Sequence, residues 1–523
     1  MLWVSTPYTR RTTPMTQAYA KLFEPATETF KALTKRMTDP EAIRAVFDVV
    51  TREVDTMGEE LKRQLLQAHA SIRDQQEVRV AVTDAEGLTR TRARRWPRTV
   101  MTRFGSIVVW RLLYQRDGRD ACAPLDAQMG LPSESFTLDV REEVARQAVI
   151  GSYDQAVEML KRCTSAKVAK RQAEELTARA ASDFCEFYNT RGREKEDTCA
   201  LLVLTFDGAG VRTRLESLRP VTRKLAEHKA GEPKRWPAKL APGKKKSSKR
   251  MAQVAAVYSV APHVRTVNDV CSTLWTPAEN DDRPPTTRPR PINKRVWASA
   301  EREVPTVIAE AIDEALTRDP AQQRRWIVLI DGHEYQRECV ERELKKRGIS
   351  ATIIVDLIHV LGYLWGAANR FHVKDGKEAQ SWVIERARAL MQGVSPSEVA
   401  RGIRQSATKR KLSKRQAVDD CADYLINNGK WMSYREALEL GFPIATGVIE
   451  GACKHLVKNR MDLGGAKWHL VGAEVVLCLR SLLLSGDWKE YWAFHEQQEM
   501  KRVHAARYAG EVPNPLPHLN KAA

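Results

Sequence analysis

The spacing of apolar residues predicts that the first third of the chain is mainly helical. Over residues 39–76 apolar side chains recur every three or four positions, which is typical of one or two amphipathic helices. A segment rich in Thr, Val, Ile and Trp follows. Its central Gly105 predicts a β-hairpin with strands near 98–104 and 107–114. Residues 138–190 return to helical spacing.

Two helices within this last stretch have the proportions of a helix–turn–helix. SYDQAVEML predicts the first helix, KRCTSA a short turn, and KVAKRQAEELTARAA the second helix. Lys167, Lys170 and Arg171 lie at the start of the second helix, where a recognition helix would meet a DNA groove. The alternative is an ordinary helical hairpin with solvated lysines, because two short helices and a turn are common.

From about Thr198 the pattern changes to short apolar runs that alternate with amphipathic helices. Five segments have the pattern of strands: ALLVLTF, AQVAAVYSV, HVRTVNDV, RRWIVLI and ATIIV. Three have the pattern of helices: EREVPTVIAEAIDEALTR, HEYQRECVERELKKRG and LIHVLGYLWGAANRF. This alternation predicts an α/β domain with a partly parallel sheet. A basic segment over 219–250 and a proline-rich one over 277–291 are expected to be exposed loops.

Composition and charge narrow the class of protein. The 523 residues carry 85 Lys and Arg against 66 Asp and Glu, a formal net charge of +19, so we expect a polyanion such as nucleic acid as the large partner. No apolar run approaches the ~18 to 20 residues that span a bilayer, and the first residues lack the apolar core of a secretory signal. Nine cysteines without a CxxC pair are typical of a reduced, cytoplasmic protein.

Three acids each follow a predicted buried strand: Asp207 in LTFDGAG, Asp331 in VLIDGHE and Asp356 in IIVDLIH. In open α/β sheets, ligands and catalytic groups gather at the carboxyl ends of the strands. An aspartate in such a place also makes a good turn or helix cap, which is the alternative for any one of them. Three at neighbouring strand ends favour a bound cation, because like charges so close need one between them.

A fourth acid, Glu450, lies near the start of a predicted helix in PIATGVIEGACKHLVKNRM. Glu450, Lys454 and Lys458 recur at four-residue spacing on one helix face. The glutamate would bind a metal ion while the lysines hold phosphates. Taken alone, the spacing equally describes a surface Glu–Lys pair that contributes a few tenths of a kcal/mol.

Four segments carry a resemblance to a known family: LTFDGAG, VLIDGHEYQ, DLIHVLGYLW and GVIEGACKHLVKNRMDLGGAKW. The chain resembles bacterial insertion-sequence transposases of the ISKra type over about residues 90–495, most specifically over 353–366 and 443–468. These are DDE enzymes with a ribonuclease-H-like catalytic domain, similar to the Mutator and ISL groups. The resemblance implies catalytic, metal-binding roles for Asp207, Asp331 and Glu450.

The Asp-x-x-His signature of the family matches Asp356 and His359. Asp356 is therefore the alternative to Asp331 as second metal ligand. His359 is expected to contact either a metal ligand or the DNA backbone, or else to pack in the protein core. The expected cofactor is Mg²⁺ or Mn²⁺, two ions per site, which serve in-line attack on phosphodiesters during DNA cleavage and strand transfer. Of the family's paired zinc-ribbon cysteines only Cys122 is present, so no zinc site is expected.

Basic and aromatic residues supply the expected contacts with double-stranded DNA at the element ends and target. The alternative for each basic residue is a solvated charge without contact to DNA, and the alternative for the tryptophan is packing in the core. The predicted DNA-binding residues are Arg90, Arg92, Arg94, Arg95, Arg98, Arg103, Lys167, Lys170, Arg171, Lys244, Lys245, Lys246, Lys454, Lys458, Arg460 and Trp468. Because transposases act on paired ends, a homodimer or higher oligomer is expected. The alternative functions are a non-catalytic DNA-binding protein derived from a transposase, and a nuclease of the same fold.

The predicted fold class is an α/β, ribonuclease-H-like catalytic domain with a helical insertion, preceded by a mainly α-helical DNA-binding region that contains the β-hairpin. The predicted parts are a helical region (1–85), the arginine-rich hairpin and linker (86–135), the helix–turn–helix-like domain (136–195), the first part of the catalytic domain (196–372), the insertion (373–442), the end of the catalytic domain (443–500) and a flexible tail (501–523).

Overall fold

The computed structural model describes residues 19–116, 118–192, 196–230, 249–275, 288–445 and 447–517. The chain forms two compact units, of which the first comprises residues 1–187 and 489–523 and the second residues 188–488. Residues from Lys489 onward therefore group with the N-terminal region, although the sequence pattern assigns 443–500 to the catalytic domain.

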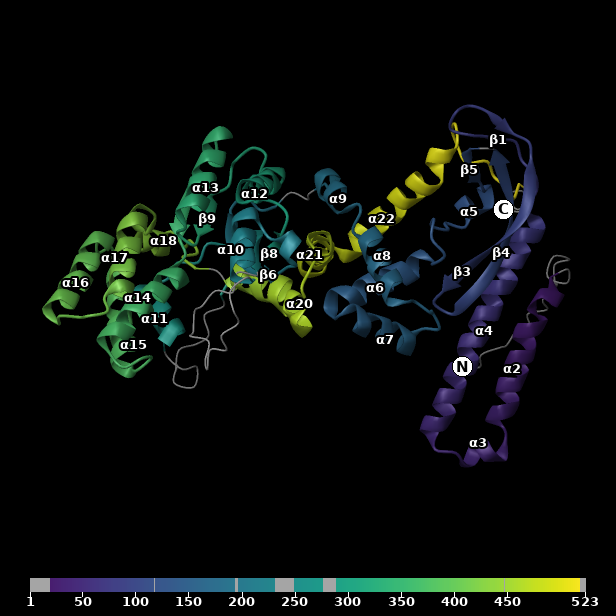
Figure 1. Ribbon diagram of the computed structural model, residues 1–523, viewed down its shortest axis with the longest axis horizontal. Coiled ribbons are helices and arrows are strands. Elements are labelled where there is room, and N and C mark those ends of the chain that lie inside the picture. Colours follow the sequence, from purple (N-terminus) through teal and green to yellow (C-terminus); the bar gives the residue numbers. More distant parts are fainter. Residues whose placement is uncertain are drawn as a thin grey trace, which may run out of the picture. The chain divides into compact units, whose positions relative to one another are not determined.

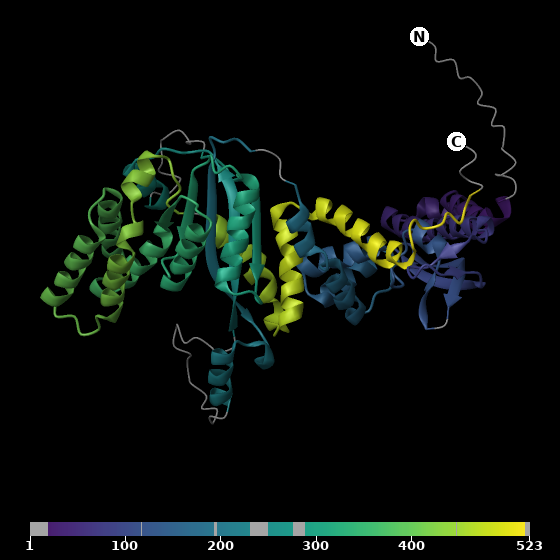
Figure 2. The same ribbon diagram turned by 90° about the horizontal axis from the view of Figure 1, so that it is seen from above.

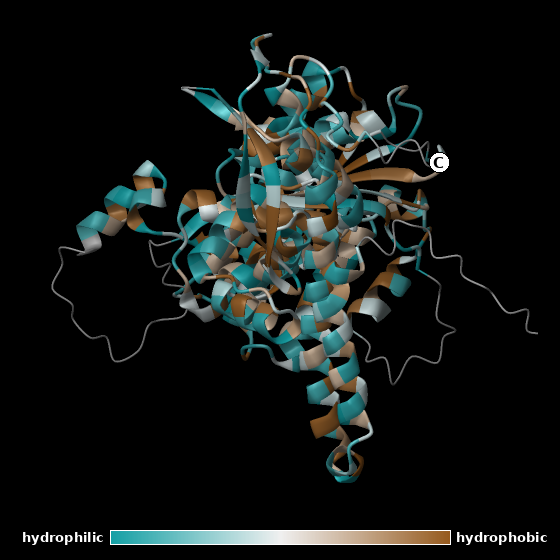
Figure 3. Cartoon of the chain, turned by 90° about the vertical axis from the view of Figure 1, so that its right-hand side faces the viewer, coloured by the Kyte–Doolittle hydropathy of each residue, from teal (hydrophilic) through white to brown (hydrophobic). Residues whose placement is uncertain are grey.

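The first unit begins with a helical hairpin (Figure 1). After η1 (Ala20–Phe23), helix α2 (Glu24–Met37) packs against α4 (Phe47–Gln76), and α3 (Pro40–Arg44) lies at the turn between them. The helices predicted over 39–76 are confirmed. Hydrophobic and hydrophilic residues mix along the whole hairpin (Figure 3), as expected for helices with one covered face.

A three-stranded antiparallel sheet packs on α4. It consists of β3 (Ala93–Thr102), β4 (Gly105–Arg116) and β5 (Arg119–Cys122), beside a small ladder of β1 (Val82–Thr83) and β2 (Thr89–Arg90). The predicted hairpin is confirmed. Val100, Ile107 and Val109 point to the buried face, where they meet Ala70 of α4, because alternate residues of a strand face opposite sides.

The next helices form a small three-helix cluster. Helix α5 (Pro124–Gln128) precedes α6 (Leu138–Ile150), α7 (Tyr153–Cys163) and α8 (Lys170–Ala180), and the last three pack on one another around Val140, Val144, Leu160 and Leu176. The predicted helix–turn–helix segment is thus two packed helices. Lys167 precedes α8 and is not part of it. Helix α9 (Phe184–Thr190) follows.

The end of the chain is bound to the first unit. Helix α22 (Trp488–Val503) is followed by η7 (Ala505–Arg507). The amide of Val78 then donates to the carbonyl of Pro515 at 3.0 Å, and Tyr508 and Leu516 are buried. The predicted flexible tail is therefore wrong for residues 501–517, because its apolar side chains and backbone amides find partners.

The second unit contains a five-stranded mixed sheet with the order β10-β9-β6-β7-β8. The strands are β6 (Leu201–Arg212), β7 (Lys249–Val260), β8 (Ile292–Ser299), β9 (Trp326–Ile330) and β10 (Ala351–Val355). Strands β6, β7 and β8 are antiparallel neighbours, whereas β9 is parallel to both β6 and β10. The chain is thus mixed α/β with a partly parallel sheet, as the pattern predicts.

One predicted strand is wrong. HVRTVNDV contains the start of helix α11 (Val267–Trp275), and the third strand of the sheet is instead β8. Thr266 and Asp269 explain the difference, because each side chain accepts a hydrogen bond from the backbone amide of the other, at 2.8 and 3.2 Å. This reciprocal pair caps the helix and outweighs the β-branched residues around it.

Helices cover the sheet and its β10 edge. Their bounds, after η2 (Leu215–Ser217) and α10 (Pro220–Ala230), are α12 (Val304–Arg318), α13 (Glu334–Lys346), α14 (Leu357–Phe371), α15 (Lys377–Met391), α16 (Pro396–Lys409), α17 (Gln416–Asn428), η4 (Gly429–Trp431), α18 (Tyr434–Glu439), α19 (Gly447–Ala452), the π-helical η5 (Cys453–Lys458), α20 (Asn459–Met461), η6 (Leu463–Gly465) and α21 (Leu470–Ser485). Helix α10 occupies part of the predicted 219–250 loop. Figures 1 and 2 show the green helices α14–α18 beside the sheet.

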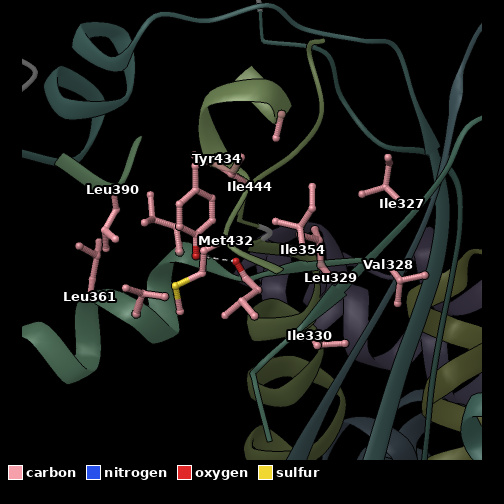
Figure 4. Close-up of a cluster of buried hydrophobic side chains, with 14 of the residues drawn as sticks. Ile327, Val328, Leu329, Ile330, Ile354, Leu361, Leu390, Met432, Tyr434 and Ile444 are labelled. Atoms are coloured by element: carbon pink, nitrogen blue, oxygen red, sulfur yellow. Dashed lines mark hydrogen bonds between the residues drawn. The ribbon is translucent and has the colours of Figure 1, made fainter. Parts of the chain in front are cut away.

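The predicted insertion, 373–442, shares one hydrophobic core with the sheet. Met432 and Tyr434 pack with Leu361 of α14 and Ile354 of β10 (Figure 4). The buried Tyr434 hydroxyl donates to the carbonyl of Val355 at 2.8 Å. The insertion therefore supports the end of β10 directly. Within the described ranges, no helix combines the length and the apolar character that crossing a membrane requires.

Candidate active site

Asp207 lies on β6, the central strand of the sheet, and its carboxylate is held by two donors. The amide of Gly208 donates to Oδ1 at 2.6 Å, and the thiol of Cys453 donates from Sγ to Oδ2 at 3.2 Å. Cys453 comes from η5, so the side chain of Asp207 points to the sheet face that α19 and η5 cover. The carboxylate is half-buried and accessible from one side.

Asp331 follows directly after β9 and lies one strand away from Asp207. The parallel register of β6 and β9 ends with Thr205 opposite Leu329, and Asp207 and Asp331 each follow two residues further along the chain. Both residues therefore lie just past the part of these neighbouring strands that pairs. Asp331 Oδ1 accepts a hydrogen bond from the amide of His333 at 2.8 Å.

A glycine and a tyrosine fix the turn that carries Asp331. Gly332 has φ +82°, and a Cβ added there would lie 2.6 Å from the hydroxyl oxygen of Tyr424. That hydroxyl donates to the carbonyl of Asp331 at 2.7 Å. Burial, and the nearby charge of Asp331, raise the pKa of Tyr424, so the hydroxyl keeps its proton and remains a donor. Tyr424 belongs to α17, in the insertion.

Asp356 lies next to Asp331 but is used as a helix cap. Its amide donates to the carbonyl of Ile330 at 2.8 Å, and its Oδ1 accepts from the amide of Ile358 at 2.8 Å at the start of α14. The residue is buried. His359, one turn into α14, is half-buried. Both acids accept a hydrogen bond from a backbone amide in this way, but Asp356 is buried and Asp331 only half-buried, so Asp331 is the better placed of the two to take a further ligand.

Glu450 is exposed on α19, which packs against β6 and β7. Lys454 and Lys458 are exposed on the π-helical η5 that follows. Cys453, on the buried side, is close to both acids: burial first, then the charges of Asp207 and Glu450, raise the pKa of its thiol. The thiol therefore stays protonated and donates to Asp207.

These residues fit divalent-metal chemistry in their donor type but not as a finished set of ligands. Carboxylate oxygens are what Mg²⁺ prefers, and Asp207 and Asp331 both lie just past the paired part of the adjacent strands β6 and β9. Within the described ranges, however, no three His, Cys, Asp or Glu side chains converge as metal ligands. Binding a metal ion would require the side chains of Asp207 and Glu450 to turn, and the first would leave the thiol of Cys453.

Two of the hairpin arginines have structural roles that argue against contact with DNA. Arg90 is buried, with its Nε 3.1 Å from Asp84 Oδ2 and its Nη1 donating to the carbonyls of Tyr114 and Asp120. Arg98 pairs with Asp126 at 2.9 Å and donates to the carbonyl of Glu134 at 2.7 Å. Each arginine would have to leave its aspartate to bind a phosphate, and breaking such an ion pair would cost several kcal/mol.

The other predicted DNA contacts of the first unit are exposed. Arg94 stacks over the exposed Trp96 with 4.6 Å to the ring centroid, and Arg95 pairs with Asp74 at 3.1 Å. Arg92 and Arg103 are exposed, as is Lys167. At the start of α8, Lys170 pairs with Asp154 at 2.7 Å and Arg171 with Glu175 at 3.1 Å, both on the surface. Exposed ion pairs contribute little to stability, so these side chains can leave their acidic partners and bind phosphates instead.

Trp468 and Arg460 belong to the core of the second unit, which corrects their prediction as DNA contacts. Trp468 is buried, and its indole N–H donates to the carbonyl of Met461 at 3.0 Å. The buried Arg460 guanidinium lies 4.8 Å from the centroid of the Trp468 ring. Lys244, Lys245 and Lys246 lie outside the described residues.

Sequence reasoning missed Cys453 and Tyr424. Cys453 stands three residues after Glu450, on the buried side of the helix, and Tyr424 is one of several aromatics in an amphipathic helix, so neither spacing signals a contact with Asp207 or Asp331. Comparison with known proteins adds no identification, since no protein-family model matches the chain and no similar protein is found among curated proteins.

Proposed function

We propose that the protein is a DDE transposase of the ISKra type, with a ribonuclease-H-like catalytic domain that cuts and joins the ends of its own element. The observation that carries the proposal is that Asp207, on β6, and Asp331, directly after β9, belong to neighbouring parallel strands, while α19, the helix that bears Glu450, packs on β6. The three acids come from distant parts of the chain.

The order of the strands supports the ribonuclease-H-like assignment. The resemblance requires the first acid to follow the first strand of the domain, the second acid to follow the fourth, and the third acid to lie on a helix after an insertion. In this sheet β6 is the first strand and β9 the fourth in chain order, and α19 follows the helices α15–α18. Asp331, directly after β9, and Glu450, on α19, fit this order, whereas Asp207 lies within β6 and not after it.

The residues that would hold the metal ions are Asp207, Asp331 and Glu450. Bound Mg²⁺ supplies activation of the attacking oxygen and stabilisation of the leaving oxygen in phosphodiester chemistry. The protein itself would hold the carboxylates in place on strands and a helix, and would bind the phosphates next to the one that reacts. Lys454 and Lys458, exposed beside Glu450, are suited to bind phosphates, whose charge they match.

A specific observation also favours a second candidate, a non-catalytic DNA-binding protein of the same descent. In the described part of the chain the carboxylates do not converge as three ligands, and one oxygen of Asp207 is bound to a thiol. A protein that only binds DNA needs no carboxylate to be available. We rank this second because the adjacency of Asp207 and Asp331 serves no purpose in such a protein.

The deciding experiment is strand transfer with pre-cleaved DNA ends taken from the sequence that flanks the chain's own coding region. With Mg²⁺ or Mn²⁺ we expect a joined product, lost at least about 100-fold in Asp207→Asn, Asp331→Asn and Glu450→Gln. Glu436→Gln is the matched control, since Glu436 is an exposed acid of the same unit. Cleavage without joining would indicate a nuclease. A DNA complex without any chemistry would indicate the binding protein.

A further inference from the structure

A basic groove of about 1080 Å³ opens in the second unit beside the helix that carries Glu450. Its walls come from the end of β7, the segment before and within β8, the loop before α19, and the groove-facing side of α19 and η5. Six cationic or titratable side chains line it: His263, Arg265, Arg288, Arg290, Lys294 and His455. Within the described ranges no acid lines this groove.

Carboxylates of the described residues do not pair with the arginines and the lysine of the groove. Among the described residues, no ion pair joins Arg265, Arg288, Arg290 or Lys294 to a carboxylate. Arg265 is held instead by backbone, since its Nη2 donates to the carbonyl of Phe442 at 2.6 Å. Burial and the charge of Arg288 lower the pKa of Arg265, against a smaller opposing effect of Asp269. A concave surface that concentrates unpaired like charge favours an anion.

The groove also has an apolar part. Tyr258, Val448 and Leu484 contribute to the walls together with Pro289 and Pro291. A double helix buries the faces of its bases and presents only phosphates and groove edges to such a surface. A single strand exposes both its phosphates and its base faces, which is the combination that a cationic and apolar groove recognises.

Two glycines of α19 form part of the groove wall. Gly447 and Gly451 line it, one turn apart, while Glu450 lies between them in sequence on the exposed surface. A Cβ added at Gly447 would meet nothing within 4 Å, and one at Gly451 would meet only His455, at 4.0 Å. The same short helix therefore borders the groove and carries the third acid.

We propose that this groove binds a single strand of DNA, with its phosphates on Arg288, Arg290 and Lys294 and its bases against the apolar wall. The inference deepens the proposed function and rests on it for the choice of DNA as the nucleic acid. Arg265, bound to backbone carbonyls, shapes the groove and adds charge.

The test measures binding without chemistry. Fluorescence anisotropy of labelled dT10, a ten-base-pair duplex and U10 is recorded in EDTA over a series of salt concentrations. We expect Arg290→Glu with Lys294→Glu to weaken dT10 binding at least tenfold and to reduce the slope of log affinity against log salt by about 1.4, which corresponds to two lost phosphate contacts. Duplex binding is expected to change less than twofold.

A second variant fills the groove and keeps its charge. Gly451→Leu is expected to weaken dT10 binding at least fivefold with the salt slope unchanged, because space and not charge is lost. The matched control is Lys374→Glu with Lys377→Glu, two exposed lysines of the same unit that do not line the groove. It is expected to change dT10 binding less than twofold.

Three results would overturn the inference: dT10 binding unchanged in the charge-reversed variant, equal loss of duplex and single-strand binding, or tighter binding of U10 than of dT10. Because the assay contains no divalent metal, it is independent of strand transfer. Groove binding without joined product would leave this inference standing and remove the proposed function. Joined product without groove binding would do the reverse.

Discussion

Cys453 donates a hydrogen bond from Sγ to Oδ2 of Asp207 over 3.2 Å, and so joins the helix segment of the third acid to the strand of the first. The thiol is buried, and its pKa is raised by that burial and by Asp207, so it is a neutral donor at physiological pH. It occupies a carboxylate oxygen that metal binding would need.

We predict that Cys453→Ala lowers the Mg²⁺ concentration for half-maximal strand transfer by about two- to tenfold, because a hydrogen bond of about 0.5–1.5 kcal/mol no longer competes for Asp207. The Mg²⁺ dependence of the rate measures this effect. Cys453→Ser keeps a donor and is the control, with a midpoint near that of the unmodified protein. A higher Mg²⁺ requirement in Cys453→Ala would show that the thiol positions the carboxylate and does not compete for it.

Asp331 and Asp356 are distinguished by one pair of variants. Asn caps a helix about as well as Asp, so Asp356→Asn is expected to keep both the start of α14 and strand transfer within about threefold. Asp331→Asn is expected to lose strand transfer, since an amide is a poor ligand for Mg²⁺. Rates are compared at matched circular dichroism. The opposite result would make Asp356 the second metal ligand.

Gly332→Ala is expected to destabilise the second unit by about 1–3 kcal/mol, because a side chain at φ +82° is strained and its Cβ would meet the Tyr424 hydroxyl. Urea unfolding gives the free energy. Gly348→Ala is the matched control: Gly348 also has positive φ, +64°, but open space around its Cβ, so it reports the backbone strain alone. Equal losses in both variants would show that the contact with Tyr424 adds nothing.

A buried charge network in the first unit predicts acid sensitivity. Arg141 of α6 contacts Glu499 of α22 at 2.9 Å, and Arg502 contacts Glu499 and Asp183, each at 2.8 Å. Burial, the largest single effect, acts to raise the pKa of Glu499, but the hydrogen bonds and charges of Arg141 and Arg502 together outweigh it and lower the pKa to about 2 from 4.5.

A lowered carboxyl pKa stabilises the fold above the unfolded value near 4.5, and this contribution is lost as the pH falls toward 2. We expect Glu499→Gln to flatten the decrease of the unfolding free energy between pH 5 and pH 3, by about 2–3 kcal/mol of the total. Urea unfolding at each pH measures it. Glu496→Gln, an exposed acid of the same helix, should leave the pH dependence unchanged. A flat profile in the unmodified protein would contradict the prediction.

Substitution of Arg90 is expected to affect the stability of the first unit, whereas substitution of Arg92 is expected to affect DNA binding. Arg90→Ala removes a buried partner of Asp84, whose pKa lies near 2 because backbone amides, Arg90 and Arg116 hold its charge, and it leaves the carbonyls of Tyr114 and Asp120 without this donor, so it should lower the thermal stability of the first unit. Arg92→Ala should leave stability unchanged and reduce the salt slope of duplex binding by about 0.9. Thermal unfolding and anisotropy test both. Weaker duplex binding by Arg90→Ala at full stability would restore its predicted role.

Local pattern determined most of the elements. Continuous apolar runs are too short for helices and too apolar for surface strands, which is why β6, β9 and β10 are predicted correctly. Asp331 and Asp356 directly follow β9 and β10, whereas Asp207, predicted to follow its strand, lies within β6, which continues to Arg212. The errors fall where two local signals compete. HVRTVNDV has strand-like residues but a reciprocal Thr266–Asp269 cap, and β8 carries the polar residues Asn293 and Lys294 near its start, after a proline-rich segment.

The sequence by itself determined which residues carry charge, which can bind metal and where the chain changes from helices to strands, because these depend on residue type and spacing over a few turns. Only the tertiary structure decided that β6 and β9 are neighbours, that Cys453 faces Asp207, and that Arg90 and Trp468 are buried. Those outcomes depend on contacts between residues far apart in the chain, whose packing and desolvation no local spacing encodes.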